Sequence, residues 1–393
     1  MISIPPIPDR QRPMLRFLLV LSVASMVGLQ GWRTLLNNFA VEWAHLDGNH
    51  MGIVQSVREI PGFLALLAVW AMLLVREHRL SALSILVLGI GVGLTGFFPS
   101  FPGLVATTML MSFGFHYYET TNQSLTLQYF DPSTAPLVLG AIRSLSAATN
   151  IAVGIMVFVM SSFLDYRMMF LVVGALVVVV GTWGMGQNPV DHQLTPQRKD
   201  MVFRWEYRLF YFLTFMAGAR RQIFIAFSVF LLVKVFGFSV REVTVLFVLN
   251  NAVSYFAAPR VGKAIVRFGE RRVLTVEYAG MVLIFLAYAL TRSRWIAAGL
   301  YVADNLLFNF TMAIRTYFQK VADQQDIAPS MAVGFTINHI AAVILPAVGG
   351  VLWVVDYRIP FLAASGLSMI SLLAVQFIPS GPGPTDTILN PKS

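Results

Sequence analysis

GLQGWRTLLNNFAVE, residues 28–42, places one arginine and two asparagines inside an otherwise apolar run. Moved along the chain by 188 positions, Arg33 falls on Arg221 in a second apolar run. The same offset relates two further sets of residues: Tyr129-Phe130 with Tyr317-Phe318, and Asn150 with Asn338. Three coincidences at one offset predict two structural halves that repeat in parallel, the second beginning near residue 189.

The composition is that of a membrane protein. Hydrophobic residues make up 57% of the chain, charged residues only 12%, and the mean hydropathy is +0.71. These values lie outside the usual range of soluble globular domains. The apolar stretches are long enough for helical spans of about 20 residues, and they lack the alternating pattern of barrel strands. The sequence therefore predicts an all-α membrane protein.

Several kinds of site are disfavoured by composition. The chain has no cysteine, which excludes disulfides and thiolate metal sites. The six histidines are scattered without metal-ligand spacing, so neither a metal nor another cofactor is expected. No G-x-x-x-x-G-K-[ST] loop is present, so uphill work must draw on an ion or solute gradient. The net charge of +9 comes from basic residues between apolar spans, and no nucleic-acid partner is expected.

The candidate spans fall six on each side of a polar segment, residues 188–205. We interpret this segment as a cytoplasmic linker between an N-terminal six-helix bundle (1–187) and a C-terminal one (206–379). The tail 380–393 is rich in Pro and Gly and is expected to be disordered. The twelve candidate spans are 15–41, 50–75, 80–98, 102–130, 136–162, 167–187, 206–235, 240–260, 273–292, 295–319, 330–355 and 359–379.

The basic residues are distributed unequally between the two sides of the predicted membrane. If the N-terminus is cytoplasmic, 16 of the 28 Lys and Arg residues lie on the inner side, six on the outer side and six within spans. The positive-inside rule then predicts that both termini are cytoplasmic. We expect a multi-pass protein of the cytoplasmic (inner) membrane.

Twelve spans, a central linker and a parallel half-repeat resemble the major facilitator superfamily of secondary transporters over essentially the whole chain. Residues 262–272 (GKAIVRFGERR), between spans eight and nine, resemble the family's G-x-x-x-D-R-x-G-R-R loop, with Val266 at the acidic position. The resemblance implies two pseudo-symmetric six-helix bundles that rock about a central cavity. Span five lacks the G-x-x-x-G-P-x-x-G-G pattern of the family's drug/proton antiporters, which disfavours multidrug export.

Charged side chains within a span are costly unless they are paired or face water, so they are candidates for function. We expect Arg33 and Arg221, with Arg220 beside the latter, to face one cavity and bind a phosphate or carboxylate through guanidinium forks. An Arg pair on spans one and seven is similar to that of the superfamily's organic phosphate/phosphate antiporters, where it clamps the phosphate. The alternative is that each arginine pairs internally with a carboxylate such as Glu119 or Asp304. The expected substrate-binding residues are Arg33, Asn37, Tyr118, Asn122, Arg220, Arg221 and Asn338.

Three residues are candidates for proton coupling. Span four carries the polar run HYYETTNQ (residues 116–123), and a carboxyl group in a cavity can exchange a proton, so Glu119 is the first candidate. Asp304, 188 positions after the start of that run, is the second. His339, near the middle of span eleven, is the third because histidine titrates in the physiological range. The alternatives are static ion pairs for the carboxylates and a helix–helix hydrogen bond for the histidine.

The other charged residues within spans are expected to be structural. Arg58 and Glu59 are adjacent in sequence and are therefore expected to point in different directions. Arg143 and Arg315 lie near the cytoplasmic ends of their spans, where their side chains can reach the interface.

These features favour a secondary active transporter that moves a small organic anion by alternating access, through proton symport or anion exchange. Its expected partners are the anion, protons and the lipid bilayer, and a monomer is expected. Two alternatives stay open: a proton-coupled exporter of amphipathic or cationic compounds, and a transporter-like sensor that binds its ligand without moving it. An intramembrane enzyme is disfavoured because no nucleophile or metal constellation accompanies the polar residues.

Overall fold

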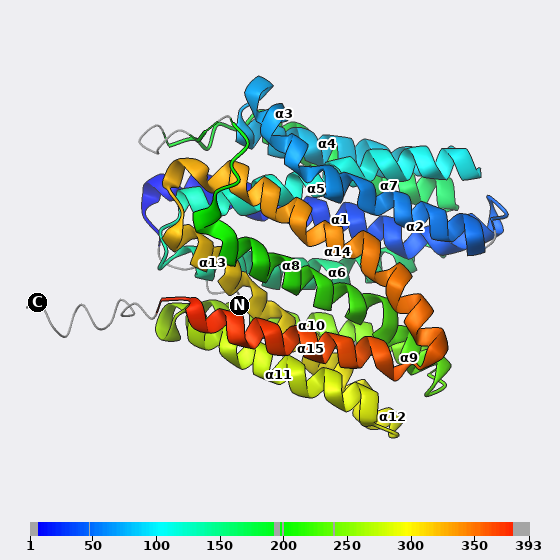
Figure 1. Ribbon diagram of the computed structural model, residues 1–393. Helices are drawn as coiled ribbons and strands as arrows, with labels where there is room; N and C mark the ends of the chain where they lie inside the picture. The colour runs from blue at the N-terminus through cyan, green and yellow to red at the C-terminus, as the bar shows by residue number, and fades with distance from the viewer. Residues whose placement is uncertain (1–6, 47, 192–196, 199, 239, 380–393) are drawn as a thin grey trace, which may run out of the picture.

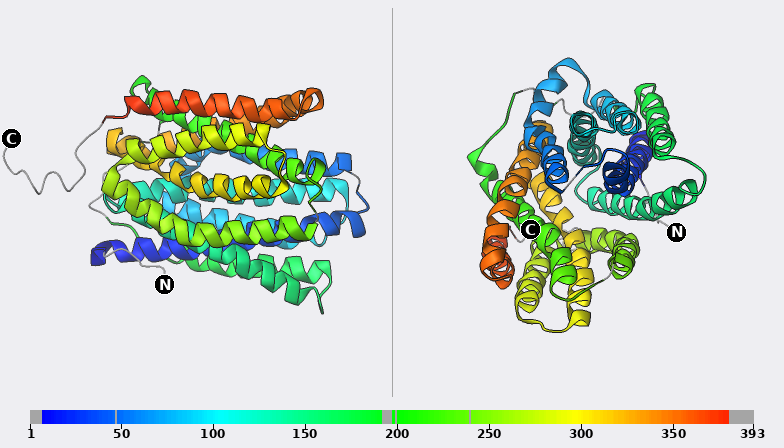
Figure 2. Two further views of the ribbon diagram at one scale, coloured as in Figure 1. Left: turned by 90° about the horizontal axis from the view of Figure 1, so that it is seen from below. Right: turned by 90° about the vertical axis from the view of Figure 1, so that its right-hand side faces the viewer.

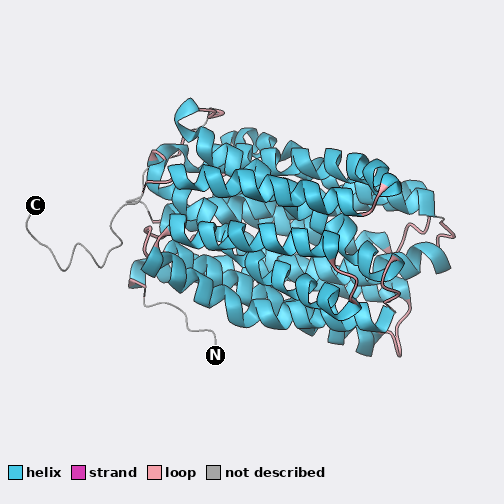
Figure 3. Ribbon diagram, turned by 60° about the horizontal axis from the view of Figure 1, so that its bottom comes forward, coloured by secondary structure: helices cyan, strands magenta, loops and turns pink. Residues whose placement is uncertain are grey.

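The computed structural model describes residues 7–379, except 47, 192–196, 199 and 239. Long helices make up almost all of this part of the chain, and none of its residues forms a strand (Figure 3). Helices are the expected outcome for long apolar segments, because each backbone N–H bonds within its own segment and none is left facing lipid. The predicted tail 380–393 lies outside the described residues.

The N-terminal half is built around α4, which packs along both α5 and α7. Glycines allow the close approach: a Cβ atom at Gly89 would lie 2.9 Å from the carbonyl oxygen of Gly174 in α7. The helices of this half are η1 (Asp9–Gln11), α1 (Arg12–Glu42), α2 (Gly48–Phe63), η2 (Leu64–Leu67), α3 (Ala68–Leu74), α4 (Glu77–Thr95), α5 (Phe101–Tyr129), α6 (Ala135–Met160) and α7 (Tyr166–Met185).

The C-terminal half contains two spans with irregular turns at their centres. The seventh predicted span has a π-helical segment after α8, and the tenth has a 3-10 turn after α12. The helices of this half are η3 (Trp205–Tyr207), α8 (Arg208–Ile223), η4 (Phe224–Ser228), α9 (Val229–Lys234), α10 (Val240–Phe268), α11 (Glu270–Leu290), α12 (Arg294–Phe308), η5 (Asn309–Thr311), α13 (Met312–Val321), η6 (Gln324–Asp326), α14 (Ile327–Val355), α15 (Arg358–Ala374) and η7 (Val375–Phe377).

Within the described residues, nine helical segments are long and apolar enough to cross a membrane. They correspond to predicted spans one to three, five to seven, nine, ten and twelve. Helices α5, α10 and α14 occupy the positions of predicted spans four, eight and eleven. For these three helices, a membrane crossing stays a prediction.

The helices form two bundles that lie side by side (Figures 1 and 2). Between the bundles, α6 packs against α10, while α2 and α5 pack against α14. The start of α1, the end of α7 and the end of α15 all lie at the left of Figure 1, which we call the terminal end. We call the opposite end the far end.

The two halves are in close contact near the terminal end, where α6 crosses α10. A Cβ atom at Gly140 would lie 2.7 Å from the Ala258 carbonyl oxygen, so the two backbones touch. Pro259 has no N–H and leaves the Tyr255 carbonyl without its helical partner. Ser144 Oγ of α6 donates to that oxygen at 2.6 Å and so satisfies it from the other half.

A second contact between the halves joins the ends of α5 and α13. Gln319 Nε2 donates to the carbonyl oxygens of Leu127, at 2.7 Å, and Phe130, at 2.5 Å. Backbone carbonyl oxygens at the end of a helix have no hydrogen-bond donor within that helix. Gln319 supplies the missing donor from the opposite bundle. Together with the α6–α10 crossing, it closes the terminal end.

The described residues of the segment 188–205 are held against the C-terminal half by hydrogen bonds and ion pairs. Asp326 is fully buried and accepts a hydrogen bond from Tyr207 at 2.8 Å. Arg198 and Arg204 form ion pairs with the same carboxylate at 2.8 and 2.9 Å. A buried carboxylate needs such partners, so the connection after α7 is held against the loop before α14.

Candidate functional site

Inside the bundles, charged side chains gather at the helices that face the centre of the molecule. The six arginines counted above within the predicted spans all lie in helices: Arg33 (α1), Arg58 (α2), Arg143 (α6), Arg220 and Arg221 (α8), and Arg315 (α13). They are accompanied by four carboxylates: Glu59 (α2), Glu119 (α5), Glu277 (α11) and Asp304 (α12). The pairing between these two sets decides which charges remain for a ligand.

The two adjacent arginines of α8 diverge to different carboxylates. Consecutive residues point about 100° apart on a helix, so Arg220 reaches Glu277 at 3.6 Å and Arg221 reaches Asp304 at 3.8 Å. Both distances exceed that of a hydrogen bond. Both oxygens of Glu277 and Oδ1 of Asp304 have no hydrogen-bond partner among the described residues. The two ion pairs are therefore longer than hydrogen bonds, and water or a ligand can donate to the carboxylate oxygens that have no partner.

Aromatic rings support the same guanidinium groups. Arg220 lies over the Tyr278 ring at 4.2 Å, and Arg221 lies over the Phe308 ring at 3.9 Å. Arg143 of the other half lies 4.7 Å from the same Phe308 ring. Such rings favour a cation that has lost part of its water. A small cavity between α8, α11 and α12 adjoins both arginine–carboxylate pairs and has room for about one water molecule.

Arg143 makes a contact between the halves. Its Nε donates to Asn309 Oδ1 at 2.6 Å. The amide nitrogen of Asn309 donates to two carbonyl oxygens of its own helix, those of Asn305 and Leu306, which turns the amide oxygen towards Arg143. The prediction that Arg143 extends towards the membrane interface is wrong, because the 3-10 turn η5 offers it a partner within the protein.

Glu119 of α5 also faces the opposite half. It lies within electrostatic range of Arg315 of α13, and more weakly of Arg143. Gln123 Nε2, one turn along α5, donates to Glu119 at 3.4 Å. Arg315 is half-buried and lies within electrostatic range of Glu119, and its route to the interface stays a prediction. Glu119 and Arg315 thus join the two halves by charge.

No ion pair of the Arg33 side chain occurs among the described residues, as is also true of Arg143 and Arg315. The Arg33 side chain is exposed, although many atoms of neighbouring helices surround it. Arg58, Glu59 and Arg221 are within its electrostatic range. Asn37, one turn further along α1, is exposed as well. This face of α1 therefore offers an unpaired positive charge to solvent.

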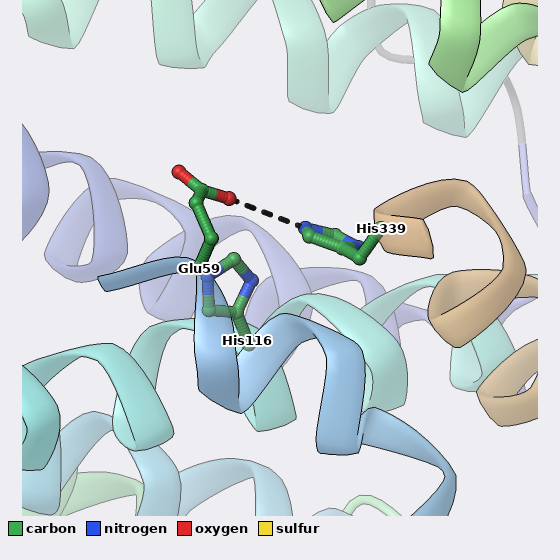
Figure 4. Close-up of side chains that lie close together, drawn as sticks. All are labelled: Glu59, His116 and His339. Atoms are coloured by element: carbon green, nitrogen blue, oxygen red, sulfur yellow. Dashed lines mark ion pairs between the residues drawn. The ribbon is translucent and has the colours of Figure 1, made fainter. Parts of the chain in front are cut away.

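A third polar group joins α2, α5 and α14 through Glu59, His116 and His339 (Figure 4). His339 Nε2 lies 3.9 Å from Glu59 Oε2, and the two imidazole centroids are 4.8 Å apart. Arg58 holds the other carboxylate oxygen, with Nη2 at 2.6 Å, so the prediction that Arg58 and Glu59 point apart is wrong. Both side chains are long enough to fold back onto one another.

Three of the remaining candidates lie within their own halves, Tyr118 and Asn122 buried and Asn338 half-buried. The Tyr118 hydroxyl hydrogen-bonds Ser22 Oγ of α1 at 2.8 Å. Asn338 donates to the Thr214 carbonyl oxygen of α8 at 3.2 Å. Asn122 is buried, and its side-chain oxygen has no hydrogen-bond partner within the described part of the chain. Tyr118 and Asn338 thus make interhelical contacts, whereas Asn122 keeps an acceptor free.

The family model described as the Major Facilitator Superfamily matches residues 14–328. The chain belongs to this superfamily. Membership confirms the predicted fold class and identifies a secondary transporter for a small molecule in a membrane. A comparison with curated proteins finds no match.

Three solved structures show how well this superfamily fold covers the chain. The Escherichia coli fucose:proton symporter aligns with a TM-score of 0.75 at 11% identity, over 94% of this chain and 100% of that protein. The human organic anion transporter MFSD10 aligns at 0.71 and 12% identity, over 94% and 100%. A bacterial homologue of the iron transporter ferroportin, in its outward-facing state, aligns at 0.75 and 12% identity, over 92% and 98%. At these identities the likeness shows the fold alone.

Proposed function

We propose that this superfamily member transports a small organic anion through the centre of the molecule. The observation that supports it is the charge of the group named above, six arginines against four carboxylates. Glu42, the last residue of α1, lies outside this group and accepts a hydrogen bond from Tyr166. Arg58, Arg220 and Arg221 have carboxylate partners, and Glu119 balances Arg315. Arg33 has no such partner, and Arg143 has a neutral amide. Charges removed from water need counter-charges, and an anionic substrate would supply them.

Arg33 and Arg221 are the proposed anion clamp. They come from α1 and α8, one in each half, and lie within electrostatic range of each other. Arg221 Nη1 has no hydrogen bond among the described residues, and its ion pair with Asp304 is long. A carboxylate or phosphate between two guanidinium groups would accept their free N–H donors and hold both halves to one ligand. Asn37 and Asn122 are proposed as further polar contacts, and Arg220 as a support.

We assign proton coupling first to Glu119. Its attraction to Arg315 links the halves, so protonation of Glu119 would weaken that link between them. Asp304 pairs with Arg221 within one half, so its protonation would leave the contact between the halves in place. Asp304 is therefore the second candidate. Exchange of one anion for another is the alternative form of coupling, and it requires no proton.

The proposed topology puts the terminal end in the cytoplasm of the cell, in line with the basic residues there. The contacts of α6 with α10 and of Gln319 with α5 would then close the cytoplasmic side. The exposed face of α1 around Arg33 would belong to a cavity that is open to the outside. We propose that the transporter works as a monomer in the inner membrane.

A ligand panel tests this function. Thermal unfolding of the purified transporter is measured with organic phosphates, carboxylates, sugars and cationic drugs, because a ligand that binds the folded state raises its stability. We expect stabilisation by one class of anion. Arg33→Gln and Arg221→Gln should each weaken it by about 10- to 100-fold in affinity, the loss of a charge-assisted hydrogen bond. Arg167→Gln, at an exposed arginine of α7, is the control and should bind normally.

The same panel distinguishes the alternative functions. Stabilisation by cations that is lost in Glu119→Gln or Asp304→Asn would overturn the anion proposal in favour of an exporter of cationic compounds. Anion binding without counterflow in proteoliposomes would identify a sensor rather than a transporter. Unchanged anion affinity in folded Arg33→Gln and Arg221→Gln would rule out the clamp.

A further inference from the structure

Glu59, His116 and His339 form a cluster that the anion pathway does not use. The three side chains come from α2, α5 and α14, and each offers one ligand atom within 4.8 Å of the other two. Two of these helices belong to the N-terminal half and one to the C-terminal half. The cluster therefore lies where the bundles meet, and a ligand bound there would contact both.

The hydrogen bonds around the cluster leave lone pairs facing one another. His339 Nδ1 lies 2.9 Å from the Phe335 carbonyl oxygen, which can only accept, so Nδ1 carries the proton. In the neutral ring, Nε2 then presents a lone pair towards Glu59 Oε2, itself an acceptor. His116 is 5% exposed, and its Nδ1 has no hydrogen-bond partner among the described residues. With the His116 proton on Nε2, its Nδ1 is also an acceptor, and three acceptors then converge without a donor between them.

We propose that Glu59, His116 and His339 bind a divalent transition metal ion, with Zn²⁺ as the best fit. Two imidazoles and a carboxylate are a common zinc ligand set, and a fourth position is left for water or another ligand. A proton on His339 Nε2 could pair that nitrogen only with Glu59 Oε2, and the third acceptor would stay without a donor. The 3.9 Å between these two atoms is also too long for a hydrogen bond. A metal ion would satisfy all three.

The geometry requires only a small adjustment. Ligand atoms about 2.1 Å from a zinc ion are roughly 3.4 Å from one another. The 3.9 Å between Glu59 Oε2 and His339 Nε2 must therefore shorten by about 0.5 Å, and the other separations, which are at most 4.8 Å, by up to about 1.4 Å. The hydrogen bond from His339 Nδ1 to a backbone carbonyl fixes the tautomer that leaves Nε2 free, as is typical of metal-binding histidines. Figure 4 shows a nitrogen of His339 facing the Glu59 carboxylate, with the His116 ring beside them.

Gly62 makes this arrangement possible. It follows Glu59 by about one helical turn, on the side of α2 that contacts α14. A Cβ atom at Gly62 would lie 2.6 Å from His339 Nε2, so any larger residue would push the imidazole away. Arg58 acts in the opposite sense, because its guanidinium group holds Glu59 Oε1 and places a positive charge near the metal. The site is expected to bind more tightly when Arg58 is neutralised.

The test uses purified full-length protein and metal chlorides, without any transported substrate. Zn²⁺ is expected to raise the unfolding temperature, whereas Mg²⁺, which prefers oxygen ligands, is not. Co²⁺ should give the visible absorption of a tetrahedral site, and Zn²⁺ should displace it. Zinc affinity should fall by at least about tenfold in His116→Gln, His339→Gln and Gly62→Ala, and rise in Arg58→Gln.

His78→Gln is the control, because His78 is also a buried histidine but packs against Phe17 in the N-terminal half. It should bind zinc like the wild type. Absence of both the zinc shift and the cobalt spectrum in the wild type would overturn the proposal. A zinc shift of equal size in His116→Gln and His339→Gln would overturn it as well. If those variants fail to fold, the wild-type cobalt spectrum and the tighter binding of Arg58→Gln still decide the question.

Discussion

Glu119→Gln is expected to abolish proton-driven accumulation of the substrate while leaving exchange intact. Glutamine has the shape of the protonated acid but cannot release a proton. In the folded protein it would lose the attraction to Arg315 across the two halves, as protonated Glu119 would. The halves could still move with a bound anion, but the pH gradient would no longer bias that movement.

The measurement is uptake into proteoliposomes, using the anion identified by thermal stabilisation. For electroneutral one-to-one symport, a gradient of one pH unit drives about tenfold accumulation in the wild type. Glu119→Gln should lower this ratio to about 1, with counterflow within about twofold of the wild type. Asp304→Asn is the comparison, since its partner Arg221 lies in the same half. Full pH-driven accumulation in Glu119→Gln would rule out this role, and its loss in Asp304→Asn alone would transfer the role to Asp304.

The fold could be predicted because its causes are local and repetitive. Apolar length fixes a membrane helix, and the offset that relates Arg33 to Arg221 predicts a repeat of two halves. The irregular turns η4 and η5 could not be predicted in the same way. They replace regular hydrogen bonds in spans that are otherwise ordinary helices, and η5 is positioned by a contact between Asn309 and Arg143.

The members of the candidate site were easier to predict than their pairings. A charge in an apolar run is conspicuous, so Arg33, Arg221 and Asp304 could be selected from sequence. Their partners depend on which helices touch, which no spacing along the chain specifies. The cluster of Glu59 and two histidines illustrates the difference. Its members come from three helices in two halves, and they come together only when α14 packs against α2 and α5.

The pairings also distinguish the two ends of the molecule. Near the terminal end, the halves are joined by backbone contact and by hydrogen bonds to carbonyl oxygens. These short-range contacts form only when the two halves are at one fixed distance from each other. Towards the centre they are joined by charges such as Glu119 and Arg315, which act over a longer range and respond to protons and anions. In the proposed mechanism, a bound ligand would bias the central contacts, and the crossing of α6 and α10 would convert that bias into open or closed states.

Gly140→Leu is expected to open the terminal end and to stop transport. The new Cβ atom would lie 2.7 Å from the Ala258 carbonyl oxygen and 3.2 Å from Pro259 Cα, both backbone atoms that cannot rotate away. Overpacking of this kind costs about 2 kcal/mol. That energy shifts the equilibrium between closed and open forms by about 30-fold. Since the strain is present only while α6 and α10 touch, the variant should fold and favour the form in which they separate.

Gly154→Leu is the matched control, because Gly154 lies on the same helix and a Cβ atom there meets nothing within 4 Å. The chain has no cysteine, so Pro132→Cys and Lys263→Cys can carry spin labels on exposed sites at the terminal ends of the two halves. Pulsed electron spin resonance should give a longer distance between the labels in Gly140→Leu than in Gly154→Leu or the parent. Uptake should fall with it, because a transporter held open at one end cannot complete its cycle. An unchanged distance with normal uptake would mean that the α6–α10 crossing is permanent and that the halves move about another contact.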